Sequence, residues 1–112
     1  MVYMEAIYKE LYITTVSFSW HPDYNIDLTN INTLEKNLAG HICSKCKYSY
    51  DTDISHEVSD NTLLYSINAD ISPVVSPYEI LCYLIYPMTN LDVYVDIKID
   101  RYINNTLYIT LD

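Results

Sequence analysis

The chain has 112 residues, with 15 acidic side chains against 6 basic ones, and its formal net charge is −9. Half of the residues are hydrophobic and only one is glycine, so the composition excludes a disordered chain and a collagen-like one. This length and apolar content predict a single domain, residues 1–112, whose core needs no metal or disulfide.

The net charge limits the kinds of molecule that the chain is expected to bind, and the cysteines indicate its cellular compartment. Nucleic-acid binding depends on Lys and Arg contacts to phosphates, so direct nucleic-acid binding is not expected of so acidic a chain. A basic protein surface is the expected partner. No apolar run reaches about 18 residues, and the N-terminus lacks a signal-peptide pattern, so neither membrane insertion nor secretion is expected. With three cysteines, this predicts an intracellular, cytoplasmic protein.

The first predicted elements are a strand and a helix. Alternate residues from Tyr12 to Trp20 are β-branched or aromatic and would share one face of a strand. Apolar residues then recur at three- and four-residue spacing from Leu28 to Leu38, which is typical of an amphipathic helix. Gly40 follows them and is the expected left-handed residue that ends this helix.

The middle of the chain predicts two strands around a loop, followed by a second helix. Residues 42–50 and 63–71 alternate as strands do, while residues 51–61 are polar and acidic and predict a loop. Ser76, Pro77 and Glu79 have the spacing of a capping box, with proline at the first helical position. This helix is expected to run to Tyr86 and to stop at Pro87.

The C-terminal part predicts a hairpin. Residues 91–99 alternate between aliphatic and polar side chains, Asn104-Asn105 is a turn candidate, and residues 107–111 form a returning strand. The element order predicts an α+β fold, namely a ferredoxin-like βαββαβ sandwich with a mostly antiparallel sheet and two helices on one face. The extra C-terminal strand would extend one edge of the sheet.

A row of carboxylates is the sharpest candidate binding feature. Asp92, Asp96 and Asp100 would lie on the polar face of the strand at residues 91–99, together with Tyr94. Such a row resembles a series of phosphates, so nucleic-acid mimicry toward an arginine-lined protein groove is one hypothesis. The alternative is an ordinary solvated strand face.

One cluster has the residue types of a metal site. Cys43 and Cys46 form a C-x-x-C pair, and His41 and His56 are further candidate zinc ligands. In a strand, however, residues three apart point to opposite faces, which favours ordinary cysteines and no cofactor.

No motif identifies a known family, and a chain with one glycine excludes glycine-rich phosphate loops. No histidine pairs recognisably with a nucleophile. The leading hypothesis is therefore a non-enzymatic interaction protein, such as a viral or mobile-element accessory factor that binds or inhibits a host protein. The alternative is a small metal-binding or cysteine-dependent domain that uses the Cys43–Cys46 region. Thirteen tyrosines and the apolar second helix also favour a homodimer.

Overall fold

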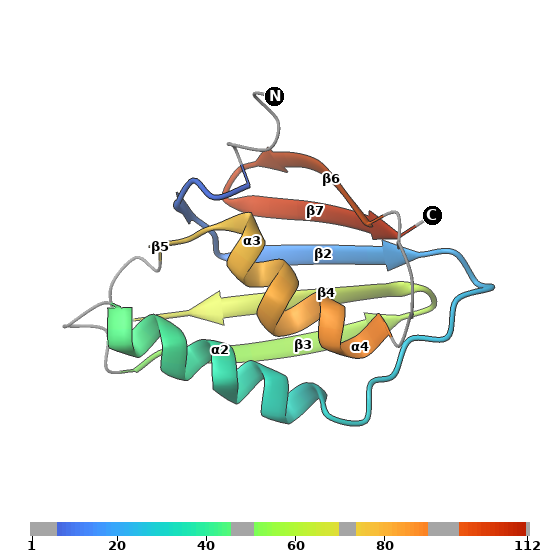
Figure 1. The fold of residues 1–112 in the computed structure, drawn as a ribbon, viewed down its shortest axis with the longest axis horizontal. Coiled ribbons are helices and arrows are strands. Elements are labelled where there is room, and N and C mark those ends of the chain that lie inside the picture. The colour runs from blue at the N-terminus through green and yellow to red at the C-terminus, as the bar shows by residue number, and fades with distance from the viewer. Residues whose placement is uncertain (1–6, 46–50, 70–73, 90–96, 112) are drawn as a thin grey trace.

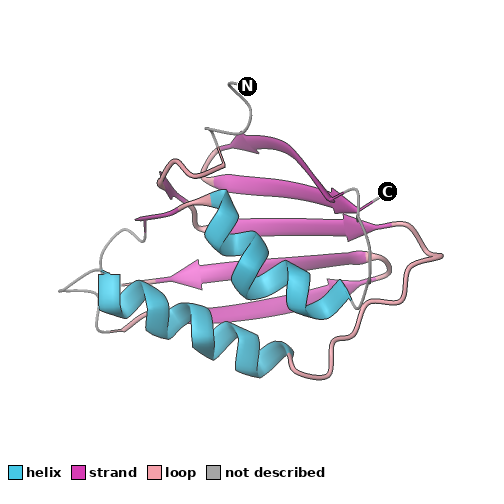
Figure 2. Ribbon diagram, in the orientation of Figure 1, coloured by secondary structure: helices cyan, strands magenta, loops and turns pink. Residues whose placement is uncertain are grey.

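The computed structural model describes residues 7–45, 51–69, 74–89 and 97–111. A five-stranded sheet is covered on one face by two helical segments (Figures 1 and 2). This arrangement confirms the α+β class that the sequence predicts. No helix in these ranges combines the length and apolar character that crossing a bilayer requires.

The strands are β1 (Leu11–Tyr12), β2 (Thr15–Trp20), β3 (Asp53–Ser59), β4 (Thr62–Asn68), β5 (Val74–Val75), β6 (Ile97–Ile103) and β7 (Thr106–Leu111). The first helix is α2 (Ile31–Lys45), and the second is continuous through α3 (Pro77–Ile80), η1 (Leu81–Ile85) and α4 (Tyr86–Thr89). The main sheet has the order β3-β4-β2-β7-β6, and β1 pairs separately with β5. Only β2 and β7 are parallel neighbours; the other described pairs are antiparallel.

The last strand takes an inner position in the sheet. β7 lies between β2 and β6, so the expectation that it extends an edge is wrong, and the ferredoxin-like topology is not confirmed. The expected turn at Asn104 and Asn105 is confirmed, with φ values of 52° and 60° that fold β7 back along β6. Leu107, Ile109 and Leu111 are all fully buried, which explains why the more apolar strand of this hairpin occupies the interior.

The first helix is longer than the sequence predicts. It begins at Ile31 and continues through Gly40 to Lys45, and Gly40 does not adopt a positive φ. The C-cap prediction is therefore wrong, and so is the strand prediction for residues 42–45. The reason is that Ile42 follows Leu38 by four residues, so the buried stripe of the helix continues past the glycine. Residues 46–50 lie outside the described ranges.

The predicted loop at residues 51–61 is mostly strand β3, which pairs with β4 along its whole length. Ile54 is buried and His56 is half-buried on its inner face, whereas its other side chains are exposed. The strand resembled a loop in sequence because it carries so few apolar residues. Asp60, with a φ of 52°, makes the turn into β4.

The second helix begins as predicted but does not stop at Pro87. Ser76 Oγ accepts a hydrogen bond from the Glu79 backbone N–H at 3.2 Å, and Glu79 Oε1 accepts one from the Ser76 N–H at 2.9 Å. A π turn then spans Leu81–Ile85. This turn, which is wider than an α turn, comes directly before Pro87, and the helix continues past the proline to Thr89.

The core lies between the sheet and the helices. Its largest fully buried side chains come from β2, β4, β7, both helices and the loop before β2: Ile13, Phe18, Leu38, Ile42, Leu63, Tyr65, Ile80, Leu84, Ile85, Met88, Leu107 and Ile109. Ile97 and Ile99 of β6 are half-buried and pack against this core. The first part of the predicted strand at residues 91–99 lies outside the described residues.

Candidate functional site

The sheet face opposite the helices carries mostly hydroxyl side chains. Ser17 on β2 lies in register between Leu64 on β4 and Tyr108 on β7. The positions before and after this row, taken across the four strands β3, β4, β2 and β7, are all serine or threonine: Ser55, Ser66, Thr15, Thr106, Ser59, Thr62, Ser19 and Thr110. None of these side chains is buried, and the charged residues lie on the two edge strands.

Asp100 is the one member of the predicted acidic row that the structure describes. It is exposed on β6, where a bulge between Ile99 and Arg101 interrupts the register. Thr110 Oγ1 donates a hydrogen bond to Asp100 Oδ1 at 3.4 Å, and the Arg101 guanidinium lies 4.2 Å from the centre of the Tyr108 ring. Basic residues therefore neighbour Asp100 on this strand. Asp92, Tyr94 and Asp96 lie outside the described residues, so the row itself stays a prediction.

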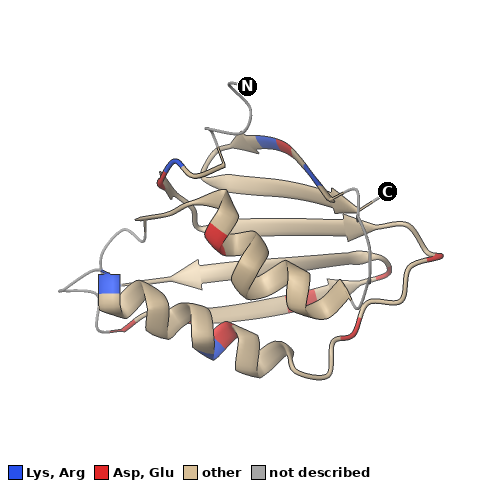
Figure 3. Cartoon of the chain, in the orientation of Figure 1, with Lys and Arg blue, Asp and Glu red and all other residues tan. Residues whose placement is uncertain are grey.

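A second acidic stretch lies along the opposite edge of the sheet (Figure 3). Asp51, Asp53, Glu57 and Asp60 are exposed on β3 or directly beside it, and we refer to these four residues as the acidic edge. None of them forms an ion pair with a residue in the described ranges. The sequence showed their charge but not their arrangement, because a polar edge strand has the composition of a loop.

Behind the acidic edge, a buried carboxylate joins α2 to β3. Glu35 is only 6% exposed, and its Oε2 atom accepts a hydrogen bond from His56 Nδ1 at 2.8 Å. His56 lies opposite Tyr65 in the sheet. Burial, together with the nearby Glu35 charge, raises the pKa of Tyr65, so its hydroxyl stays protonated and donates to the Leu84 carbonyl at 3.4 Å.

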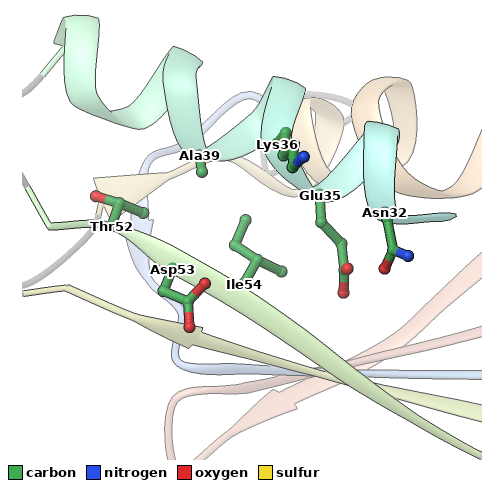
Figure 4. A pocket seen from close by; sticks show the side chains of 7 residues that line it. All are labelled: Asn32, Glu35, Lys36, Ala39, Thr52, Asp53 and Ile54. Carbon is green, nitrogen blue, oxygen red and sulfur yellow. The ribbon is translucent and has the colours of Figure 1, made fainter.

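A cavity of about 400 Å³ opens beside Glu35, between α2 and the beginning of β3 (Figure 4). Its lining residues are Asn32, Glu35, Lys36, Ala39, Thr52, Asp53 and Ile54. The Glu35 carboxylate extends from the helix toward the strand, and Asp53 lies at the strand side. The cavity therefore combines a buried carboxylate and an amide with apolar side chains on both walls, and the exposed Asp53 carboxylate lies at its rim. Sequence reasoning missed it, because its two halves are brought together only by the packing of α2 on β3.

A different glutamate–histidine pair lies near the other end of α2. Glu79 contacts His41 Nε2, and Lys45 Nζ lies 2.9 Å from Glu79 Oε1. Lys45 also forms an ion pair with Glu10, and the His41 ring stacks on Tyr83 with centroids 4.8 Å apart. This network joins α2, the capping box of α3 and the segment before β1.

Glu79 is strongly held in its charged form. Burial opposes its ionisation, but hydrogen bonds from the Ser76 backbone, Lys45 and His41 outweigh the effect of burial and lower the pKa of Glu79 to about 2. Each oxygen of this carboxylate already has donors, so no room remains for an external partner.

The structure does not bring the predicted zinc ligands together within its described ranges. His41 contacts Glu79, whereas His56 contacts Glu35. Cys43 is half-buried in α2 with a free thiol, and Cys46 lies outside the described residues. Among the residues that can be described, no group of three or more His, Cys, Asp or Glu side chains is placed to hold a metal ion.

Exposed tyrosines gather on the outer side of the second helix. Tyr78 and Tyr86 flank Cys82 at four-residue spacing, and the Tyr8 ring lies 4.8 Å from that of Tyr78. A hydrogen bond with Cys82 raises the pKa of Tyr78, and burial raises that of Tyr86.

Comparison with protein-family models, with curated proteins and with solved structures gives no match to this chain.

Proposed function

We propose that this chain is a small, acidic, non-enzymatic interaction protein that binds a basic surface of another protein through the acidic edge. The observation that carries the proposal is the set of four exposed carboxylates along an edge strand that form no ion pair with the described residues. With a net charge of −9, the whole molecule attracts a basic partner and steers it over a distance of about one Debye length, roughly 8–10 Å.

The spacing of the edge supports a phosphate-like mode of binding. Asp53 and Glu57 lie on the same side of β3, four residues and roughly 13 Å apart along the strand. The neighbouring outward side chain is the small Ser55, so a long arginine or lysine of the partner can reach between the two carboxylates. The nucleic-acid-mimicry hypothesis thus applies to this edge as well as to Asp92, Asp96 and Asp100. An accessory factor of a virus or mobile element, acting on a host protein in the cytoplasm, is the form of the proposal that the sequence favours.

The surroundings of the histidines also favour binding over catalysis. His41 and His56 each contact a glutamate, and the described hydrogen bonds join neither ring to a cysteine, serine or threonine. Such a contact is the usual sign of a general base that activates a nucleophile.

The test uses two matched triple variants and the partner obtained by cross-linking and affinity capture with the wild-type chain. Asp53→Asn/Glu57→Gln/Asp60→Asn removes three of the four charges of the acidic edge, and Asp92→Asn/Asp96→Asn/Asp100→Asn removes the same charge elsewhere. We expect the first variant to lower the association rate about tenfold at low salt, because steering depends on nearby charge. Equal rates for the wild type and the first variant would overturn the proposal, as would a loss confined to the second variant.

Self-association is a second candidate, favoured by the exposed rings of Tyr8, Tyr78 and Tyr86. Tyrosine provides a large contact area with a polar end and is enriched at protein interfaces. Light scattering at high concentration is expected to give a dimer mass that falls to about 13.1 kDa in Tyr78→Ser/Tyr86→Ser. A monomer mass for the wild type would exclude this second candidate.

A further inference from the structure

We propose that the cavity between α2 and β3 is a socket for an arginine side chain of the partner. This inference rests on the proposed function, because it names the group that the acidic edge would recruit. The cavity has a volume of about 400 Å³, enough for a guanidinium group and part of its stem.

The buried Glu35 carboxylate is the first argument. Glu35 is 6% exposed, yet the described residues give it one hydrogen bond, from His56 to Oε2. A carboxylate has about four acceptor positions, and a buried one is costly when donors do not fill them. Among the described residues no buried side-chain oxygen lacks a hydrogen-bond partner, so the remaining acceptor capacity of the Glu35 carboxylate is where it lines the cavity. A cationic donor entering the cavity would fill this capacity.

The spread of acceptors favours arginine over lysine. Glu35 and Asn32 lie on the helix side of the cavity, and the Asp53 carboxylate lies at its rim, on the outward side of β3. Guanidinium has five N–H donors that diverge in one plane, whereas an ammonium group is a compact point charge with three. The apolar side chains of Ala39 and Ile54 would contact the methylene stem of the entering side chain. Asp53 also belongs to the acidic edge, so the surface that attracts the partner leads directly to the socket.

Lys36 provides a test in which binding should become stronger instead of weaker. It lines the same cavity but forms no ion pair with a described carboxylate. Its ammonium group would repel an entering cation. Removal of this charge should therefore strengthen arginine binding, whereas a cavity with no binding role would not respond.

The experiment titrates the ¹⁵N-labelled full chain with acetyl-Gly-Arg-Gly-amide and, separately, with the same peptide carrying citrulline. Citrulline is a neutral isostere of arginine. We expect the arginine peptide to shift the amide signals of the cavity-lining residues and the citrulline peptide to bind at least about tenfold more weakly. Equal binding of the two peptides, or shifts that avoid these residues, would overturn the socket.

Four variants sharpen the result. Glu35→Gln should weaken the arginine peptide by about five- to tenfold, Asp53→Asn by about two- to threefold because its carboxylate lies only at the rim, and Lys36→Gln should strengthen it about two- to fivefold. Asp23→Asn is the matched control: it removes one exposed carboxylate that does not line the cavity, and it should change nothing. Asp53→Asn and Lys36→Gln alter exposed residues, so they keep the test valid if Glu35→Gln unfolds the chain.

The outcomes separate the socket from the proposed function. If the peptide does not occupy the cavity but the acidic-edge variant still slows partner association, the socket is wrong and the interaction proposal stands. If the peptide occupies the cavity but the acidic-edge variant associates with the partner as fast as the wild type, the arginine socket stands and the proposed function is wrong.

Discussion

Two glutamate–histidine pairs join α2 to its neighbours, and they differ in how many donors the carboxylate receives. Glu79 accepts hydrogen bonds from the Ser76 backbone, from Lys45 and from His41. Within the described part of the chain, Glu35 accepts one, from His56, and the cavity opens beside it. The Glu79 carboxylate has donors at both oxygens and holds three segments of the chain together. The Glu35 carboxylate keeps part of its capacity, and this is what makes it a candidate site.

The largest expected effect of this difference is on folding stability. Glu79→Ala removes the acceptor for the cap, for Lys45 and for His41 together, so we expect a loss of about 2–4 kcal/mol in the free energy of unfolding. Urea denaturation followed by circular dichroism measures it. The matched change, Glu35→Ala, should cost less, because it removes one hydrogen bond. A larger loss for Glu35→Ala would contradict the view that Glu79 has the structural role and Glu35 the binding role.

The same carboxylate should make stability depend on pH. The pKa of Glu79 falls from its ordinary value of 4.5 to about 2 on folding, so its contribution is fully present above pH 4.5. That contribution, about 3 kcal/mol by linkage, is lost as the pH falls from about 4.5 through about 2. The difference in unfolding free energy between the wild type and Glu79→Gln should therefore shrink over this range. A difference that stays constant from pH 6 to pH 2, roughly the span of the linkage, would contradict it.

A smaller effect is expected when each carboxylate is replaced by an apolar side chain of similar size. Removing one partner of a buried pair is costly when the other partner stays buried, but it can be neutral or gain about 1 kcal/mol when the other partner reaches water, as the half-buried His56 does. We expect Glu35→Leu to leave the melting temperature unchanged or raise it, and Glu79→Leu to lower it. The arginine peptide should lose its binding to Glu35→Leu at the same time. If Glu35→Leu kept both its stability and its binding of the arginine peptide, Glu35 would have neither a structural role nor a binding role.

Local patterns in the sequence were enough to predict several elements. The capping box at Ser76 and Glu79 depends on residues three positions apart, and the buried faces of β2, β4 and β7 follow a two-residue period. The turn at Asn104 and Asn105 is likewise a local signal. The α+β class follows from the order of these elements.

The remaining features depend on contacts between distant residues. β3 resembles a loop because only its pairing with β4 makes it a strand, and the position of β7 depends on the choice of β2 as a partner. Glu35 and His56 lie 21 residues apart on a helix and a strand, so no spacing rule could pair them. The candidate site was missed for the same reason.

The smallest expected effect concerns Gly40, which lies on α2 between Glu35 and His41. It is exposed in a helical conformation, and no atom lies within 4 Å of the position that a Cβ would take. Gly40→Ala should therefore raise the free energy of unfolding by about 0.5–1 kcal/mol and the melting temperature by a few degrees. If the helix instead ended at a left-handed Gly40, as the sequence suggested, alanine would be strained there and the variant would be less stable. Such a loss of stability in Gly40→Ala would also contradict the difference between the two glutamate–histidine pairs. His41 and Lys45 reach Glu79 only because α2 continues beyond Gly40, so a helix that ended there would leave Glu79 as short of donors as Glu35.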